Sequence, residues 1–204
     1  MITIYDLKPR FQNLLRPLCA KLVSIGITAN QVTIFAAILS AVGGAAILFN
    51  PTSPVPLFLL PVLLFIRMAL NAIDGMMARE FNQKSNLGAI LNELTDVIAD
   101  VLLYLPFALI PGINAYLIVA LVMLGIMVEM IGVVSIQIGA SRRYDGPFGK
   151  SDRAFAFGFV AVVLVLGFVP VLWLNILLAA LVALSCYTIF NRAKQALKEA
   201  GDLS

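Results

Sequence analysis

Residues 113–140, INAYLIVALVMLGIMVEMIGVVSIQIGA, form a long apolar run that contains a single charged side chain, Glu129. About 20 apolar residues in helical conformation cross the hydrocarbon core of a bilayer, so this run predicts a membrane-spanning helix. Pro111-Gly112 separates it from the preceding apolar stretch, and Pro170 separates the last two stretches. The other apolar stretches cover residues 31–49, 56–78, 88–110, 154–169 and 171–190. We therefore predict an all-α polytopic membrane protein with six transmembrane helices.

The composition of the chain also indicates a lipid environment. Hydrophobic residues make up 61% of the 204 residues and charged residues 12%, whereas about 25% of residues are charged in soluble domains. We expect one domain, residues 1–204, in which residues 28–204 form the six-helix bundle. Cys19 and Cys186 lie far apart in the sequence, which argues against a disulfide framework or a thiolate metal site.

The basic residues predict the orientation of the chain in the membrane. Of the 14 basic residues, 13 lie before the first span, in alternate loops, or after the last span. The positive-inside rule makes these segments, and hence both termini, cytoplasmic. This bias explains the high pI, so no nucleic-acid partner is expected. We expect an integral protein of the bacterial inner membrane.

The segment before the first span, residues 1–27, places leucines at helical spacing with basic residues between them. This pattern predicts an N-terminal amphipathic helix that lies at the membrane interface, membrane lipids being its partners. Pro9 and Pro17 are possible breaks in it.

Polar side chains inside the expected spans indicate a functional site, because an ionisable group at membrane depth costs ~2.5–3.5 kcal/mol. Arg67, Asn71 and Asp74 share one face of the second helix at 100° per residue. On the third helix, a slowly drifting stripe is formed by Gly88, Asn92, Asp96 and Asp100. Oxygen ligands from facing helices suit a hard divalent cation such as Mg²⁺ or Mn²⁺. The chain has no histidine, which excludes histidine-based zinc chemistry. We expect Arg67 and Glu129 to pair with each other or with Asp100.

One pattern extends over both of these helices. Asn71-Ala-Ile-Asp74-Gly75-Met-Met-Ala78-Arg79 is followed by Gly88, Asn92 and Asp96 after gaps of eight, three and three residues. It resembles the signature of the CDP-alcohol phosphatidyltransferase family, D-x2-D-G-x2-A-R-x8-G-x3-D-x3-D. Every gap matches and six of the eight fixed positions are identical, while Asn71 and Asn92 replace the first and third aspartates. The resemblance covers nearly the whole chain, because that family also has six spans with both termini inside.

The resemblance implies roles for individual residues. Asp96 would be the base that deprotonates the acceptor alcohol. Two Mg²⁺ or Mn²⁺ ions would be held by Asn71, Asp74, Asn92 and Asp96, with Glu93 and Asp100 restoring the lost charge. The nucleotide would contact Asn30, Thr33, Asp74, Gly75, Ala78, Arg79 and Gly88. An anionic acceptor would be held by Arg142, Arg143, Lys150 and Arg153. The plainer alternatives are small-residue helix packing for the glycines and Ala78, a cytoplasmic anchor for Arg79, and positive-inside charge for the loop.

The implied reaction moves a phosphatidyl or phosphoalcohol group from a CDP-linked lipid donor, most commonly CDP-diacylglycerol, to a small alcohol or phosphoalcohol, releasing CMP. A homodimer is implied by the resemblance alone. Because two aspartates are replaced, a catalytically impaired protein that binds CDP-lipid stays open as an alternative. A small transporter or flippase is a third possibility, although the three loops on the outer side carry no charge that would extend a pathway.

Overall fold

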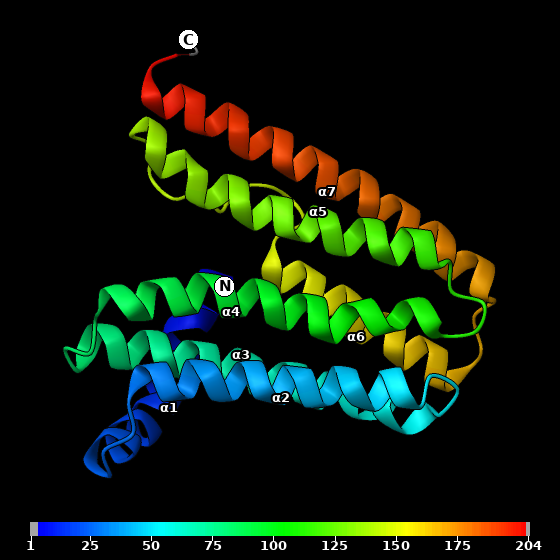
Figure 1. Cartoon of the computed structure of the whole chain (residues 1–204), viewed down its shortest axis with the longest axis horizontal. Helices are drawn as coiled ribbons and strands as arrows, with labels where there is room; N and C mark the ends of the chain where they lie inside the picture. The colour runs from blue at the N-terminus through cyan, green and yellow to red at the C-terminus, as the bar shows by residue number, and fades with distance from the viewer. Residues whose placement is uncertain (1–3, 203–204) are drawn as a thin grey trace. The chain divides into compact units, whose positions relative to one another are not determined.

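The computed structural model describes residues 4–202, and every regular element in that range is helical. The elements are α1 (Ile4–Ser24), α2 (Ala29–Phe49), α3 (Pro54–Glu80), α4 (Asn86–Tyr104), the 3₁₀ helix η1 (Leu105–Leu109), α5 (Ala115–Val134), the 3₁₀ helix η2 (Ser135–Ile138), α6 (Lys150–Leu166) and α7 (Val171–Ala200) (Figure 1). Residues 1–3 of the expected interfacial segment and residues 203–204 of the expected bundle lie outside the described residues. The all-α fold class is confirmed.

Four of these helices are long and apolar enough to cross a membrane: α2, α3, α5 continued by η2, and α7. The other two predicted spans correspond to α4 and α6. Three acidic side chains lie within the 19 residues of α4, namely Glu93, Asp96 and Asp100. α6 has only 17 residues and carries Lys150, Asp152 and Arg153 in its first turn. The structure thus has four candidate membrane spans among its described residues, and the count of six stays a prediction.

The ends of several helices differ from the predicted spans. The third span was expected to reach residue 110, but α4 ends at Tyr104 and η1 follows, because Pro106 has no amide hydrogen to continue the α-helix. Gly167 caps α6 in the left-handed conformation at φ 67°, which ends the helix before residue 169. α7 continues ten residues beyond the predicted end at 190. α1 is continuous through Pro9 and Pro17, so neither proline breaks it.

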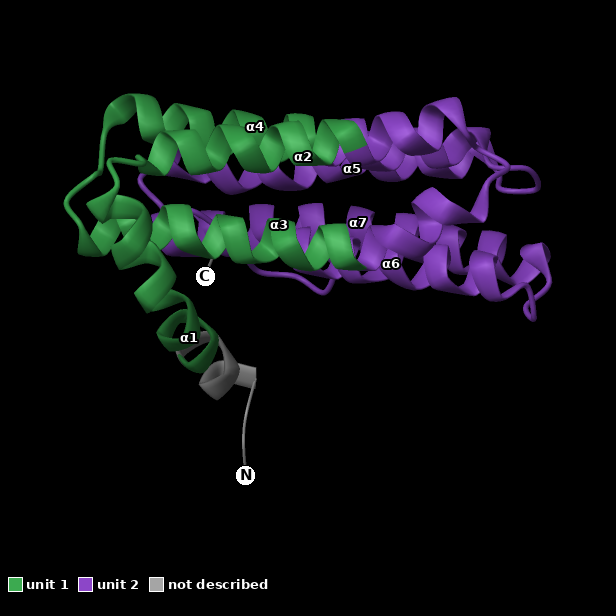
Figure 2. Ribbon diagram, turned by 90° about the horizontal axis from the view of Figure 1, so that it is seen from below, with its two compact units in different colours: residues 1–42, 62–99 green, residues 43–61, 100–204 purple. Residues whose placement is uncertain are grey.

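The described chain divides into two compact units, residues 1–42 with 62–99 and residues 43–61 with 100–204 (Figure 2). In unit 1, α1, α2 and α3 share a small apolar core in which Cys19, Val32 and Met76 are buried. Two further contacts join α1 to α3. Arg16 forms an ion pair with Glu80 through two hydrogen bonds of 2.8 and 3.0 Å, and the Phe11 and Phe65 rings meet edge to face. These contacts fix α1 beside the end of α3 that carries the family-like pattern.

In unit 2, α5 and α7 pack along each other, as Figure 1 shows. Tyr104 stacks on Phe157 with 4.1 Å between ring centroids, and Phe107 contacts the same ring edge to face. At the start of α7, Asn175 accepts a hydrogen bond from the Asn114 amide and donates one to the Gly112 carbonyl. The unit is therefore tied together by aromatic packing and by side-chain caps at a turn.

Large apolar side chains lie exposed along the helices, which matches a lipid-facing surface. Among them are Phe35, Phe58, Phe65, Ile98, Met130, Phe155, Trp173 and Phe190. So many exposed large apolar side chains are rare on soluble monomers. The outward faces therefore support the membrane assignment independently of hydropathy.

Candidate active site

The start of α2 is held by three hydrogen bonds between backbone amides and polar side chains. Thr28 and Gln31 form a reciprocal cap: the Gln31 amide donates to the Thr28 hydroxyl, and the Thr28 amide donates to the Gln31 side chain. Thr28 therefore acts as the N-cap of α2. The Ala29 amide donates to the Gln83 side chain at 2.7 Å. The loop that precedes α4 is thereby fixed to the beginning of α2.

Asp74 is buried on α3 with 4% of its surface exposed. The Thr33 hydroxyl of α2 donates a hydrogen bond of 2.7 Å to Asp74 Oδ2. A carboxylate at this depth needs such a partner, because desolvation of an unpaired charge costs several kcal/mol. Thr33 and Asp74, which lie 41 positions apart and are both expected from the family resemblance to contact the nucleotide, are thus in direct contact.

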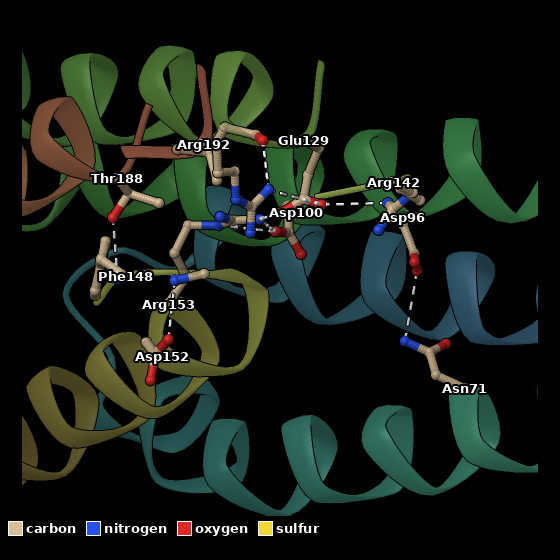
Figure 3. Close-up of polar contacts among 12 residues, drawn as sticks. Asn71, Asp96, Asp100, Glu129, Arg142, Phe148, Asp152, Arg153, Thr188 and Arg192 are labelled. Carbon is tan, nitrogen blue, oxygen red and sulfur yellow. Dashed lines mark hydrogen bonds and ion pairs between the residues drawn. The ribbon is translucent and has the colours of Figure 1, made fainter. Parts of the chain in front are cut away.

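The polar stripes of α3 and α4 face each other, as expected from their helical spacing. Asn71 Nδ2 lies 3.5 Å from Asp96 Oδ1, a contact drawn in Figure 3. Arg67 donates a hydrogen bond of 3.2 Å to the main-chain carbonyl of Asp96. Asp96 is therefore held between two α3 side chains, one at its carboxylate and one at its backbone.

Gly88 and Gly75 leave space that neighbouring polar side chains fill. A Cβ at Gly88 would lie 2.8 Å from Asn30 Oδ1 and 3.0 Å from the Ser85 hydroxyl. A Cβ at Gly75 would lie 3.2 Å from Arg79 Nη1. The space beside Gly88 is thus occupied by the Asn30 side chain, and the space beside Gly75 by the Arg79 side chain. Both are side chains expected to contact the nucleotide, and neither space is filled by the backbone of a neighbouring helix. Ala78, also predicted to contact the nucleotide, is half-buried against the apolar core of unit 1.

The oxygen-bearing side chains of α3 and α4 are of the type that binds a hard divalent cation. Asp74, Asp96, Asn71 and Asn92 offer carboxylate and amide oxygens, the ligands that Mg²⁺ and Mn²⁺ prefer. Asn92 is exposed, while Asn71, Asp96 and the neighbouring Glu93 are half-buried. Within residues 4–202, histidine, cysteine, aspartate and glutamate side chains form no group of three placed to hold a metal ion.

In unit 2, Arg153 is at the centre of a buried cluster of charged side chains (Figure 3). Its guanidinium donates to Asp100 Oδ2 through Nε at 3.2 Å and Nη2 at 3.0 Å, and to Glu129 at 3.1 Å. Glu129 also contacts Arg142 at 3.5 Å and Arg192 at 3.8 Å. Asp100, expected among the metal ligands, thus has a guanidinium partner. Glu129 and Asp100 share that arginine, whereas Arg67 bonds to Asp96 in unit 1.

The other expected acceptor residues lie around the loop before α6. Arg143 binds Asp145 through two hydrogen bonds of 2.7 and 2.9 Å and also pairs with Glu199. The Arg143 guanidinium lowers the pKa of the Asp145 carboxyl, and Asp145 in turn raises the pKa of Arg143. Arg142 lies over the Tyr144 ring, and Lys150 begins α6. Of the four expected acceptor residues, Arg142 and Arg153 thus meet at Glu129, whereas Arg143 pairs with Asp145 and Glu199.

Two residues of these networks were missed by the sequence reasoning. Arg192 is 2% exposed and bonds to the carbonyls of Asp145 and Val128. Its signal was the spacing of Ser185, Thr188 and Arg192 on one helical face, which becomes visible only when α7 is extended beyond 190. Gln83, which caps α2, lies in a loop and carries no periodic signal.

Comparison with known proteins supports the pattern of residues that meets in unit 1. A family model described as CDP-alcohol phosphatidyltransferase matches residues 26–190, most of the chain. The chain belongs to the CDP-alcohol phosphatidyltransferase family. It is therefore a membrane transferase of phospholipid biosynthesis, as the resemblance of residues 71–96 implied.

One relative matches this chain in sequence over almost its full length, and solved structures match it in fold. The chain is 44% identical to the inner membrane protein YnbA of Escherichia coli (strain K12) over 196 residues, covering 96% of this chain and 97% of that one. Phosphatidylinositol phosphate synthase of Mycobacterium tuberculosis with CDP-DAG bound superposes with a TM-score of 0.76 at 20% identity, covering 92% and 96% of the two chains. A structure of that synthase with manganese and citrate gives 0.75 at 20% identity, covering 92% and 91%. At this identity the solved structures establish the fold of the family member, an integral membrane protein.

Proposed function

We propose that this chain transfers a phosphatidyl group from CDP-diacylglycerol to the hydroxyl of a small alcohol, with release of CMP. The observation that carries the proposal is the convergence, in one unit, of the family pattern: Asp96 of α4 lies against Asn71 of α3, and Asp74 against Thr33 of α2. The helices α2, α3 and α4 thus each contribute polar side chains to these contacts. The donor follows from the family and from the CDP-DAG bound to a protein of the same fold.

In the proposed reaction Asp96 is the general base. Its carboxylate takes the proton of the acceptor hydroxyl, whose oxygen then bonds to the phosphorus of the phosphatidyl group. The bond from that phosphorus to the oxygen bridging it to CMP breaks, and CMP leaves with this oxygen. Arg67 and Asn71 hold Asp96 in place through its carbonyl and carboxylate, which keeps the base oriented without a change in backbone conformation.

A divalent cation, Mg²⁺ or Mn²⁺, would supply positive charge that stabilises the diphosphate and the CMP leaving group. Asp74, Asp96, Asn71 and Asn92 are the residues that would hold it, and Glu93 lies next to Asn92 on α4. Two ions are the family expectation, although the asparagines provide two negative charges fewer than aspartates would. The manganese bound to a protein of the same fold supports this choice of ion.

The nucleotide would lie against the residues at the start of α2 and the end of α3. Asn30 and Thr33 contribute amide and hydroxyl groups from the first turn of α2, and Arg79 offers a guanidinium fork for the diphosphate. Gly75, Ala78 and Gly88 keep side-chain bulk away from this region, and Gly75 accommodates Arg79. The acceptor would bind among the residues around the loop before α6: Arg142, Arg143, Lys150 and Arg153.

For the whole protein we propose one transferase domain, residues 1–204, that spans the bacterial inner membrane six times with α1 at the interface. Both termini and the active site face the cytoplasm, because the basic residues gather on that side. A homodimer is proposed from the family alone.

The proposed activity is tested by CMP release from CDP-diacylglycerol with purified protein, a panel of alcohols, and Mg²⁺ or Mn²⁺. We expect CMP only when donor, alcohol and cation are all present, and none after chelation of the cation. Binding of CDP-diacylglycerol without CMP release would replace the enzyme with a lipid-binding protein. Absence of both binding and release would favour the transporter.

Gly88→Ala should weaken donor binding by displacing the Asn30 side chain. A lost hydrogen bond is worth about 0.5–1.5 kcal/mol, so KM for CDP-diacylglycerol should rise roughly threefold to tenfold. The measurement is a KM series for Gly88→Ala, Asn30→Ala and the double variant. If Gly88 acts through Asn30, the double variant resembles Asn30→Ala; fully additive effects would contradict this explanation.

Replacing Asn71 and Asn92 together by aspartate should tighten cation binding, because two carboxylates are added to the donor set. We expect a lower Mn²⁺ dissociation constant, by about tenfold or more, measured by electron paramagnetic resonance of free Mn²⁺. Asn50→Asp, at the end of α2 and outside the pattern, is the matched control. An unchanged Mn²⁺ dissociation constant in the double variant would place the cation ligands elsewhere.

A further inference from the structure

The three arginines expected to hold an anionic acceptor, together with the buried Arg192, are already matched by carboxylates within unit 2. The set consists of Arg142, Arg143, Arg153 and Arg192 with Asp100, Glu129, Asp145 and Glu199, which contact one another through ion pairs. Four positive and four negative formal charges cancel in this set. Unlike a group of unpaired arginines, it presents no net positive charge to a ligand.

Arg153 carries one buried donor group that the ion pairs of this set do not use. Its Nε and Nη2 are used by Asp100 and Glu129, and the residue is 3% exposed. Within residues 4–202, its Nη1 is buried and has no hydrogen-bond partner. A buried donor left without an acceptor costs about 1–3 kcal/mol. The remaining capacity at Arg153 is therefore one donor group that needs one acceptor oxygen.

An uncharged hydroxyl and a phosphate would affect the ion pairs of Arg153 differently. A hydroxyl oxygen satisfies Arg153 Nη1 and leaves the ion pairs intact. A phosphate would bring up to two negative charges close to Asp100 and Glu129. It would repel them, or draw the guanidinium away and leave two buried carboxylates without a counter-charge, which is strongly unfavourable. The arrangement thus favours hydroxyl recognition and rejects an anion.

We propose that the acceptor is an alcohol without a phosphate or other net negative charge, one of whose hydroxyl oxygens accepts a hydrogen bond from Arg153 Nη1. Glu129 and Asp100 are the residues that set this specificity, because they neutralise the arginines that would otherwise attract an anion. This inference rests on the proposed transferase function. Asp100 lies one helical turn after the proposed base Asp96 on α4.

The turnover test compares alcohols with their own monophosphates: glycerol, myo-inositol and L-serine, each against its phosphate ester. CMP release from CDP-diacylglycerol by the full chain is measured for each member. In each pair that reacts, we expect kcat/KM for the unphosphorylated alcohol to be higher by roughly tenfold or more. Preference for the phosphorylated member overturns the inference while leaving the transferase function intact.

If no alcohol reacts, only the proposed transferase function is refuted. A phosphate-binding test then still decides whether the charged set rejects an anion. Inorganic phosphate should not stabilise the wild-type protein against thermal unfolding, whereas Glu129→Gln should gain phosphate stabilisation because one neutralising charge is lost. Glu199→Gln, which removes one of the two carboxylate partners of Arg143, is a second variant should Glu129→Gln not fold. Glu80→Gln, the same substitution beside Arg16 in unit 1, should gain nothing. Phosphate stabilisation of the wild type, or equal gain in Glu80→Gln, contradicts the inference.

Discussion

Asp96→Asn should reduce CMP release from CDP-diacylglycerol by about 10²–10⁴-fold, the contribution typical of a general base. The amide is isosteric with the carboxylate but cannot take the proton of the acceptor hydroxyl. Arg67 bonds to the backbone of residue 96, so its contact survives the substitution. We therefore expect loss of kcat with little change in the thermal unfolding temperature.

Asp202→Asn is the matched control for this variant, because Asp202 is exposed beyond the end of α7. It should retain wild-type turnover. If Asp96→Asn retains turnover as well, the base lies elsewhere, and Glu93 and Asp100 on the same helix are the next residues to replace. Loss of folding in detergent would instead show that Asp96 has a structural role.

Arg153→Met should be the most destabilising single substitution in unit 2. It leaves Asp100 and Glu129 buried without their shared guanidinium, and removal of one partner of a buried ion pair costs about 3–5 kcal/mol. For a chain of this size that corresponds to a fall of roughly 10 °C in unfolding temperature. Arg153→Lys keeps the charge but loses the planar fork that reaches both carboxylates, so its unfolding temperature should lie between those of Arg153→Met and the wild type.

The control for Arg153→Met is Arg16→Met. Arg16 pairs with Glu80 at 2.8 Å, but its side chain is 48% exposed, so water solvates both partners once the pair is broken. Its unfolding temperature should stay close to that of the wild type. Equal effects of the two substitutions would mean that the cluster around Arg153 is accessible to solvent and contributes little to stability.

The helical class and the pairing of the polar stripes could be predicted because both depend on local periodicity. Arg67, Asn71 and Asp74 recur at helical spacing, as do Asn92 and Asp96, and the short loop between their helices permits only an antiparallel return. The contact of Asn71 with Asp96 therefore followed from the sequence. The match of every gap to the family signature added the expected chemistry.

The partners of the arginines could not be predicted, because they depend on long-range packing. Arg153 meets Asp100 and Glu129 across 53 and 24 residues of sequence, and no periodic pattern relates these positions. The sequence therefore indicated a cationic surface, whereas the structure pairs each arginine of the set with a carboxylate. Arg192 was missed because the predicted span ended at residue 190, whereas α7 continues to Ala200.

The central claim is that oxygen donors of α3 and α4 hold a divalent cation against the diphosphate of a CDP-linked lipid. The most direct test is an anomalous diffraction map of crystals grown with Mn²⁺ and CDP-diacylglycerol. We expect a manganese peak bonded to the carboxylates of Asp74 and Asp96 and to a phosphate oxygen of the donor. A donor bound elsewhere, or manganese with no ligand from α3 and α4, would contradict the account.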